Sequence, residues 1–210
     1  MSILKSLMNL FRTTRSLPYT APAITPKAGL NEEITKSLDN WMNRPIYKEL
    51  TIAIIDATAD HELIQTIFDN LEKKFPEDYQ KEYETVLSFN KARQTIYVIW
   101  LLEAEVNNGG FNQYYENSSG QFAELTPEAL RLIGANMFAD LMIKANQLYE
   151  DENEQITKHM DGTIEGFSKS YEDNPLDAMD TEFYEIEKVE NLRELQINFI
   201  RKNKGEFADK

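Results

Sequence analysis

Apolar side chains recur at helical spacing along most of the chain after residue 30. In the clearest run, residues 60–75, a polar cap is followed by five apolar positions and then by Pro76. Positions three or four apart share one face of a helix, and proline ends a helix, so this run predicts a helix capped by Asp60. The same spacing predicts helices over residues 31–44, 47–57, 126–148 and 189–200. Thr126 is the expected cap of the helix over 126–148.

The stretch "TIYVIWLL", residues 95–102, is the most apolar part of the chain. Its β-branched and aromatic residues favour a strand on propensity alone. However, good helix formers flank it, and no second strand of comparable strength is available to pair with it. We therefore expect a buried central helix over residues 90–108, with Ile96, Ile99, Trp100 and Leu101 in the core. The predicted fold class is all-α, a compact multi-helix domain of about seven to nine helices with a basic amphipathic N-terminal segment.

The first 29 residues differ from the rest in charge and pattern. Residues 1–30 carry four basic side chains and no acid, and residues 1–15 place their apolar positions on one helical face. Pro18, Pro22 and Pro26 follow at regular intervals and are typical of a linker. We expect an N-terminal segment and linker over residues 1–29 and an acidic helical domain over 30–205. The segment either docks on its own domain or on a neighbouring subunit, or it binds a membrane surface and makes the protein a peripheral adaptor.

The stretch "EVNNGGFNQYYENSSG" follows the predicted central helix and is rich in amides. Glycine directly after a helix adopts the left-handed conformation without steric penalty, so a corner with positive φ at Gly109 or Gly110 is expected. A simple corner needs fewer amides, which leaves a recognition surface open as the second interpretation. An enzyme or small-molecule pocket around the Asn107–Gly120 loop is a third. The candidate recognition loop consists of Asn107, Asn108, Gly109, Gly110, Phe111, Asn112, Gln113, Asn117 and Ser118.

Two longer stretches carry a family resemblance. "WLLEAEVNNGGFNQYYENSSGQFAELTPEALRLIGA" and "NPLDAMDTEFYEIEKVENL" resemble the DNA-mimic-protein family, whose C-terminal domain is otherwise catalogued as a domain of unknown function. The resemblance covers residues 80–205, roughly. It implies an all-helical domain without an established enzymatic activity. It also implies a protein whose carboxylates imitate the phosphates of DNA.

The net charge of the chain also favours a protein that imitates DNA. The chain has 22 basic and 36 acidic residues, a net charge of −14, and residues 151–190 alone carry −10. A direct nucleic-acid binder needs a basic face, so we expect instead a non-enzymatic protein-binding module. Its hypothetical partner is a basic nucleic-acid-binding protein, a regulator or a nuclease. The candidate acidic partner surface consists of Asp177, Asp180, Glu187, Glu190 and Glu194. The alternative is a solvated acidic surface, as in many bacterial-type cytosolic proteins.

Several classes of chemistry are not expected. The chain has no Cys, which excludes disulfides and thiol catalysis, and its two histidines, His61 and His159, stand in no known ligand motif. No phosphate-binding loop or nucleophile elbow is present, so no catalytic residue, cofactor or metal is predicted. No apolar run is long enough to span a membrane, and we expect a cytoplasmic protein. The acidic body argues against membrane association, and a homodimer remains open.

Overall fold

The computed structural model describes residues 32–76 and 81–209, and these residues form helices and no strand. The predicted all-α class is therefore confirmed. The chain divides into two compact units, residues 1–46 and 47–210. The basic amphipathic segment predicted over residues 1–29 lies outside the described residues. Within the described part of the chain, no helix has the length and apolar character that crossing a membrane requires.

The described part of the first unit is the helix α2, Glu32–Met42, which confirms the helix predicted over residues 31–44. The side chain of Arg44, two residues after α2, folds back onto Trp41 of that helix. Its guanidinium lies 3.7 Å from the centre of the Trp41 ring, and its Nη1 donates a hydrogen bond to the Trp41 carbonyl at 2.8 Å. The domain boundary that the sequence predicts between residues 29 and 30 stays a prediction.

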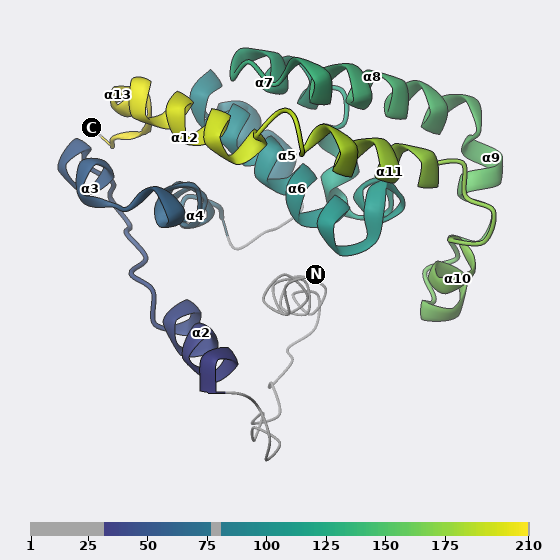
Figure 1. The fold of residues 1–210 in the computed structure, drawn as a ribbon, viewed down its shortest axis with the longest axis horizontal. Helices are drawn as coiled ribbons and strands as arrows, with labels where there is room; N and C mark the ends of the chain where they lie inside the picture. Colours follow the sequence, from purple (N-terminus) through teal and green to yellow (C-terminus); the bar gives the residue numbers. More distant parts are fainter. Residues whose placement is uncertain (1–31, 77–80, 210) are drawn as a thin grey trace. The chain divides into compact units, whose positions relative to one another are not determined.

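The second unit is built around one long helix. α6 runs through its middle, with α4 on one side and α7 and α8 on another, while α11 and α12 follow each other across it (Figure 1). The elements of this unit are α3 (Ile52–Ala57), α4 (Asp60–Glu72), α5 (Glu82–Ser88), α6 (Lys91–Glu116), the 3-10 helix η3 (Ser118–Phe122), α7 (Thr126–Leu132), α8 (Asn136–Asp151), α9 (Asn153–Ile156), α10 (Ile164–Lys169), α11 (Asp177–Ile186), α12 (Leu192–Lys202) and α13 (Lys204–Phe207).

α6 confirms the predicted central helix. Asn90 caps it, since its side chain accepts a hydrogen bond from the backbone N–H of Arg93 at 3.0 Å. The apolar run 95–102 covers the whole circumference of the helix, and nearly all of it is buried. Trp100 is the exception. It is half-buried, and its ring stacks on Phe68 of α4 with 3.5 Å between the ring centres, so the core placement predicted for it was only partly right.

The predicted helix over 126–148 is wrong in its continuity. Gly134 has a φ of +89° and separates α7 from α8. The predicted cap at Thr126 is also wrong, because Leu125 occupies that position. The Thr126 hydroxyl is instead engaged inside the core, where it donates to the Phe122 carbonyl at 2.9 Å and lies 3.0 Å from the hydroxyl of Tyr114. The hydroxyl therefore bonds within the core, and no side chain of the described residues caps the start of α7.

The helix predicted over residues 47–57 forms only from Ile52, with Thr51 as its cap, and two other helix ends also differ from the prediction. α4 begins at Asp60 itself, with Ala59 at the cap position, so the Asp60 carboxylate stands in the first turn. α12 begins at Leu192, and Val189 is 72% exposed in the turn before it. Both cases show the same limit, since apolar spacing locates a helix but does not fix its first residue.

Candidate functional site

The corner in α6 lies at Gly109 and Gly110. Gly109 has φ −149° and ψ 24°, whereas Gly110 has φ +72° and ψ −174°. The prediction of a positive φ is thus confirmed at Gly110. This combination of angles is accessible essentially to glycine alone, and it divides α6 into two helical parts that meet at a kink.

Asp180 of α11 reaches the corner from a distant part of the sequence. Its Oδ1 accepts a hydrogen bond from the backbone N–H of Phe111 at 2.7 Å. The N–H of Phe111 is exposed by the turn, so Asp180 acts as the cap of the second part of α6. A Cβ atom at Gly110 would collide with the Asp180 carboxylate. Gly110 is therefore needed both for its backbone angles and for the approach of Asp180.

Two tyrosines donate hydrogen bonds to backbone carbonyls at the corner. The Tyr171 hydroxyl donates to the Gly109 carbonyl at 2.8 Å, and the Tyr184 hydroxyl donates to the Val106 carbonyl at 3.2 Å. Backbone carbonyls inside a fold need hydrogen-bond donors, and the two tyrosine hydroxyls supply donors here. The segment from α10 to α11 thus supplies donors and an acceptor to one corner of α6.

A buried amide network continues this attachment. Asn112 is 1% exposed, and its Nδ2 donates to the Ser170 hydroxyl at 2.7 Å. Its Oδ1 accepts from Asn174 Nδ2 at 2.8 Å, and Asn174 also donates to the Ser170 carbonyl. These partners are all inside the fold, where an unpaired amide would be destabilising.

A second set of side-chain amides surrounds a buried carboxylate. Glu105 is 2% exposed, and its Oε2 accepts from Gln113 Nε2 at 2.6 Å and from Asn117 Nδ2 at 2.8 Å. Gln113 Oε1 in turn accepts from Asn108 Nδ2 at 2.7 Å, and Asn107 bonds the Glu103 carbonyl at 2.7 Å. No local pattern predicts this role of Glu105, because only the corner brings residue 113 back to residue 105.

The candidate recognition loop therefore faces largely inward. Phe111, Asn112 and Gln113 are buried, Asn117 is half-buried, and Ser118 is exposed. The sequence has more amides here than a simple corner needs. These amides form hydrogen bonds between the two parts of α6 and with the α10–α11 segment. A recognition role for this loop stays a prediction.

The five carboxylates of the candidate acidic surface fall into two groups. Asp177, Glu187 and Glu194 are exposed and form no ion pair with the described residues. Asp180 caps the part of α6 that follows the corner, and Glu190 accepts hydrogen bonds from backbone N–H groups in the first turn of α8.

The Glu190 contacts resemble those of Asp180. Its Oε2 accepts from the backbone N–H groups of Met137 at 3.1 Å and Phe138 at 3.2 Å. These groups are unpaired donors at the start of α8, where a negative charge is favourable. Glu190 is therefore committed to the fold in part, although its role in partner binding stays a prediction.

The acidic segment as a whole faces solvent. Ten of the thirteen carboxylates in residues 151–190 are exposed. The ten are Asp151, Glu152, Glu154, Asp161, Glu165, Glu172, Asp173, Asp177, Glu185 and Glu187. Among the described residues, no group of acidic or histidine side chains has the arrangement of a metal site.

Asp180 has an unusual electrostatic environment. Burial raises its pKa to about 6; the hydrogen bond from Phe111 opposes this rise, and the charge of Asp177 adds to it. The Tyr171 and Tyr184 pKa values are also raised, by burial first and then by nearby carboxylates, with Asp180 among them in both cases. Asp180 and Tyr184 are four residues apart on α11 and so share one face of it, and the neighbouring charges are negative. The corner of α6 and the candidate acidic surface thus meet at this aspartate.

The comparisons with known proteins agree with the sequence motifs. The family model described as DMP19-like protein matches residues 87–203, which is more than half of the chain. The matched region runs from the end of α5 to the end of α12 and contains the corner, Asp180 and the exposed acidic segment. Searches of curated proteins and of solved structures gave no match. The predicted resemblance is confirmed, and the chain belongs to the DMP19-like protein family.

Proposed function

We propose that this protein is a non-enzymatic binding module whose acidic surface occupies the DNA-binding face of a basic regulator or nuclease. The observation that carries this proposal is the exposure of ten carboxylates within residues 151–190, in a chain of the DMP19-like protein family. DNA presents one negative charge per about 1.7 Å of its axis, so a protein that replaces it must present many carboxylates to one partner.

The free carboxylates of the candidate surface support this role. Asp177, Glu187 and Glu194 lie on or beside α11 and α12, and none is held by a basic side chain of the described residues. Carboxylates on neighbouring helical turns are about 5–6 Å apart, which lets several of them contact one basic surface. Charges that the described residues leave unpaired can steer and bind a cationic partner.

The environment of Asp180 supports a cationic contact at this point. Tyr184 is 40% exposed, and it stands at helical spacing from Asp180 and Glu187 on α11 and its end, so an aromatic ring shares a face with two carboxylates. An arginine of the partner can place its guanidinium over such a ring while its N–H groups face the carboxylates. A cation there would also offset the desolvation that raises the Asp180 pKa.

The test has two stages. A pull-down at low and at high salt, with mass spectrometry of the retained proteins, identifies basic nucleic-acid-binding proteins that are released by salt. Each candidate is then measured for binding to this protein in competition with a DNA duplex. We expect competition that weakens steeply with salt, because screening shortens to about 8 Å at physiological ionic strength.

A charge-matched pair of variants makes the test specific. The first reverses Asp177, Glu187 and Glu194 to Lys, and leaves the two capping carboxylates in place. The control reverses Glu49, Glu84 and Glu124, which are exposed carboxylates outside this surface, and changes the net charge by the same amount. The first variant should lose competition while it keeps its helical circular dichroism, and the control should retain most of it. Equal losses, or a partner that binds DNA and this protein simultaneously, would contradict the proposal.

A further inference from the structure

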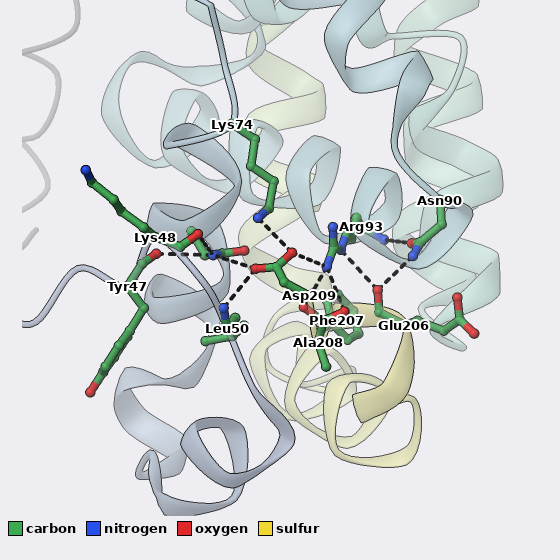
Figure 2. Close-up of polar contacts among 11 residues, drawn as sticks. Tyr47, Lys48, Leu50, Lys74, Asn90, Arg93, Glu206, Phe207, Ala208 and Asp209 are labelled. Carbon is green, nitrogen blue, oxygen red and sulfur yellow. Dashed lines mark hydrogen bonds and ion pairs between the residues drawn. The ribbon is translucent and has the colours of Figure 1, made fainter.

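Residues 204–209, which we call the strap, cross back to the beginning of the second unit. The strap consists of α13 and the two residues after it, and α13 packs on α3 and α6. Asp209 and Leu50 are joined by two hydrogen bonds: the Asp209 N–H donates to the Leu50 carbonyl at 2.7 Å, and the Leu50 N–H donates to Asp209 Oδ2 at 2.8 Å. Figure 2 shows the Asp209 carboxylate at the centre of these contacts.

Two basic side chains converge on the same carboxylate. Lys74 Nζ lies 2.7 Å from Asp209 Oδ1, and Arg93 Nη2 lies 2.9 Å from it. Asn70 Nδ2 adds a longer contact of 3.3 Å to Oδ2. The side chains of Lys74 and Arg93 are only 22% and 14% exposed. Asp209 is thus surrounded by four donors, of which two are positively charged and largely removed from water.

The strap backbone is held by the first turn of α6. Arg93 donates to the carbonyls of Glu206, Phe207 and Ala208 at 2.8 to 3.1 Å, and Asn90 donates to the Glu206 carbonyl at 2.7 Å (Figure 2). Phe207 is 1% exposed, so the strap also buries an aromatic ring. These contacts place the carboxylate among the donors independently of its own hydrogen bonds.

The four donors around Asp209 have the chemistry of an oxyanion site. A lysine, an arginine, a side-chain amide and a backbone N–H together offer charge and directed hydrogen bonds to two oxygens. If the carboxylate is removed, two cations remain close together and largely buried, which is unfavourable unless an anion replaces it. In a protein of net charge −14, such a local concentration of positive charge also stands out.

We infer that Lys74, Arg93, Asn70 and the Leu50 N–H form an anion-binding site for a carboxylate, and that the strap closes it by inserting Asp209 as a built-in ligand. The strap is then a latch, and a carboxylate from solution competes with it only when the latch is open. Most of these residues lie outside the region 87–203 that matches the family model, with Arg93 as the exception. The inference is independent of the proposed DNA mimicry.

The test is chemical rescue by formate. The full chain with Asp209→Ala is melted at neutral pH in sodium chloride and in sodium formate of equal ionic strength. We expect the variant to melt about 5–10 °C below the wild-type protein in chloride. Formate should recover at least a third of this loss. The wild-type protein, in which Asp209 fills the site, and the control Asp177→Ala should shift by less than about 1 °C, which excludes a general salt effect.

A double variant identifies the site of rescue. In Lys74→Met with Asp209→Ala, the response to formate should be largely lost. The inference is overturned if formate shifts all proteins equally, if Asp209→Ala melts like the wild-type protein, or if the double variant responds as strongly as the single one. If Asp209→Ala is unfolded in chloride, formate must restore a cooperative melting transition, and failure to do so likewise overturns it.

Discussion

Asp180 and Asp209 are both partly buried carboxylates that join distant segments, yet their surroundings have opposite effects. Burial by itself raises the pKa of both. At Asp180 one backbone N–H opposes this rise, and the pKa stays at about 6. At Asp209 the contacts from Lys74, the Leu50 N–H and Arg93 outweigh burial and lower the pKa to about 2.

This difference separates a carboxylate whose ionised form stabilises the fold from one whose ionised form is disfavoured by burial. The charge of Asp209 is neutralised within the protein, so its ionised form favours folding. No basic side chain of the described residues pairs with Asp180, and burial disfavours its ionised form at neutral pH, so that form would gain from an external cation. Groups that are poorly compensated in this way occur more often at functional sites. The predictions below test the contrast in order of decreasing effect.

Replacing Gly110 should have the largest effect, because it disturbs the Asp180 corner itself. Gly110→Val forces a branched side chain into a conformation that it does not adopt and into contact with Asp180. Backbone strain and overpacking together should lower the free energy of unfolding by about 3–5 kcal/mol. Urea denaturation measures this loss. Gly205→Ala is the control, since nothing lies within 4 Å of a Cβ at that position. A small loss at Gly110 would show that the corner relaxes easily.

Removing Asp209 should have the next largest effect. Asp209→Ala leaves Lys74 and Arg93 without their shared partner and should lower the free energy of unfolding by about 2–3 kcal/mol at neutral pH. Because the folded-state pKa is below the ordinary value of 3.8, the stabilisation is present above that pH. It is lost as the pH falls from 3.8 toward 2. Acid titration of both proteins should therefore show their stabilities converging in this range, and curves that stay parallel would contradict the pairing.

Asp180→Asn should have an effect of opposite sign. The amide oxygen can still accept from Phe111 N–H, while the unfavourable charge is removed, so stability at neutral pH should rise by about 1–2 kcal/mol. Because the folded-state pKa is raised to about 6, the wild-type protein gains stability as the pH falls from about 6 toward 3.8. The advantage of the variant should disappear over the same range. Destabilisation at neutral pH would mean that the charge is needed as a helix cap.

The smallest expected change in the free energy of unfolding distinguishes Glu190 from Glu187. Glu190→Gln weakens the cap of α8 and should lower the free energy of unfolding by about 0.5–1 kcal/mol. Glu187→Gln changes an exposed carboxylate and should stay within about 0.5 kcal/mol of the wild-type protein. Their melting curves measure stability, and the competition assay with DNA measures binding. If both variants destabilise equally, the division of the acidic surface into capping and free carboxylates is wrong.

The sequence was sufficient for the features that depend on local pattern. Apolar spacing and the absence of a pairing strand gave the all-α class, and Asn90 and the two glycines marked both the start of the central helix and its corner. These predictions succeeded because propensity, capping and glycine conformation act over a few neighbouring residues. The family motifs succeeded for the same reason, since they are contiguous in the chain.

Tertiary structure alone decided which polar groups are free. Asp180 and Asp177 are three residues apart on α11, yet one is turned into the corner of α6 and the other faces solvent. Likewise, nothing local marks Asp209 as the partner of Lys74 and Arg93. Whether a carboxylate is neutralised depends on donors that are distant in sequence and on burial, and both arise only when the helices pack.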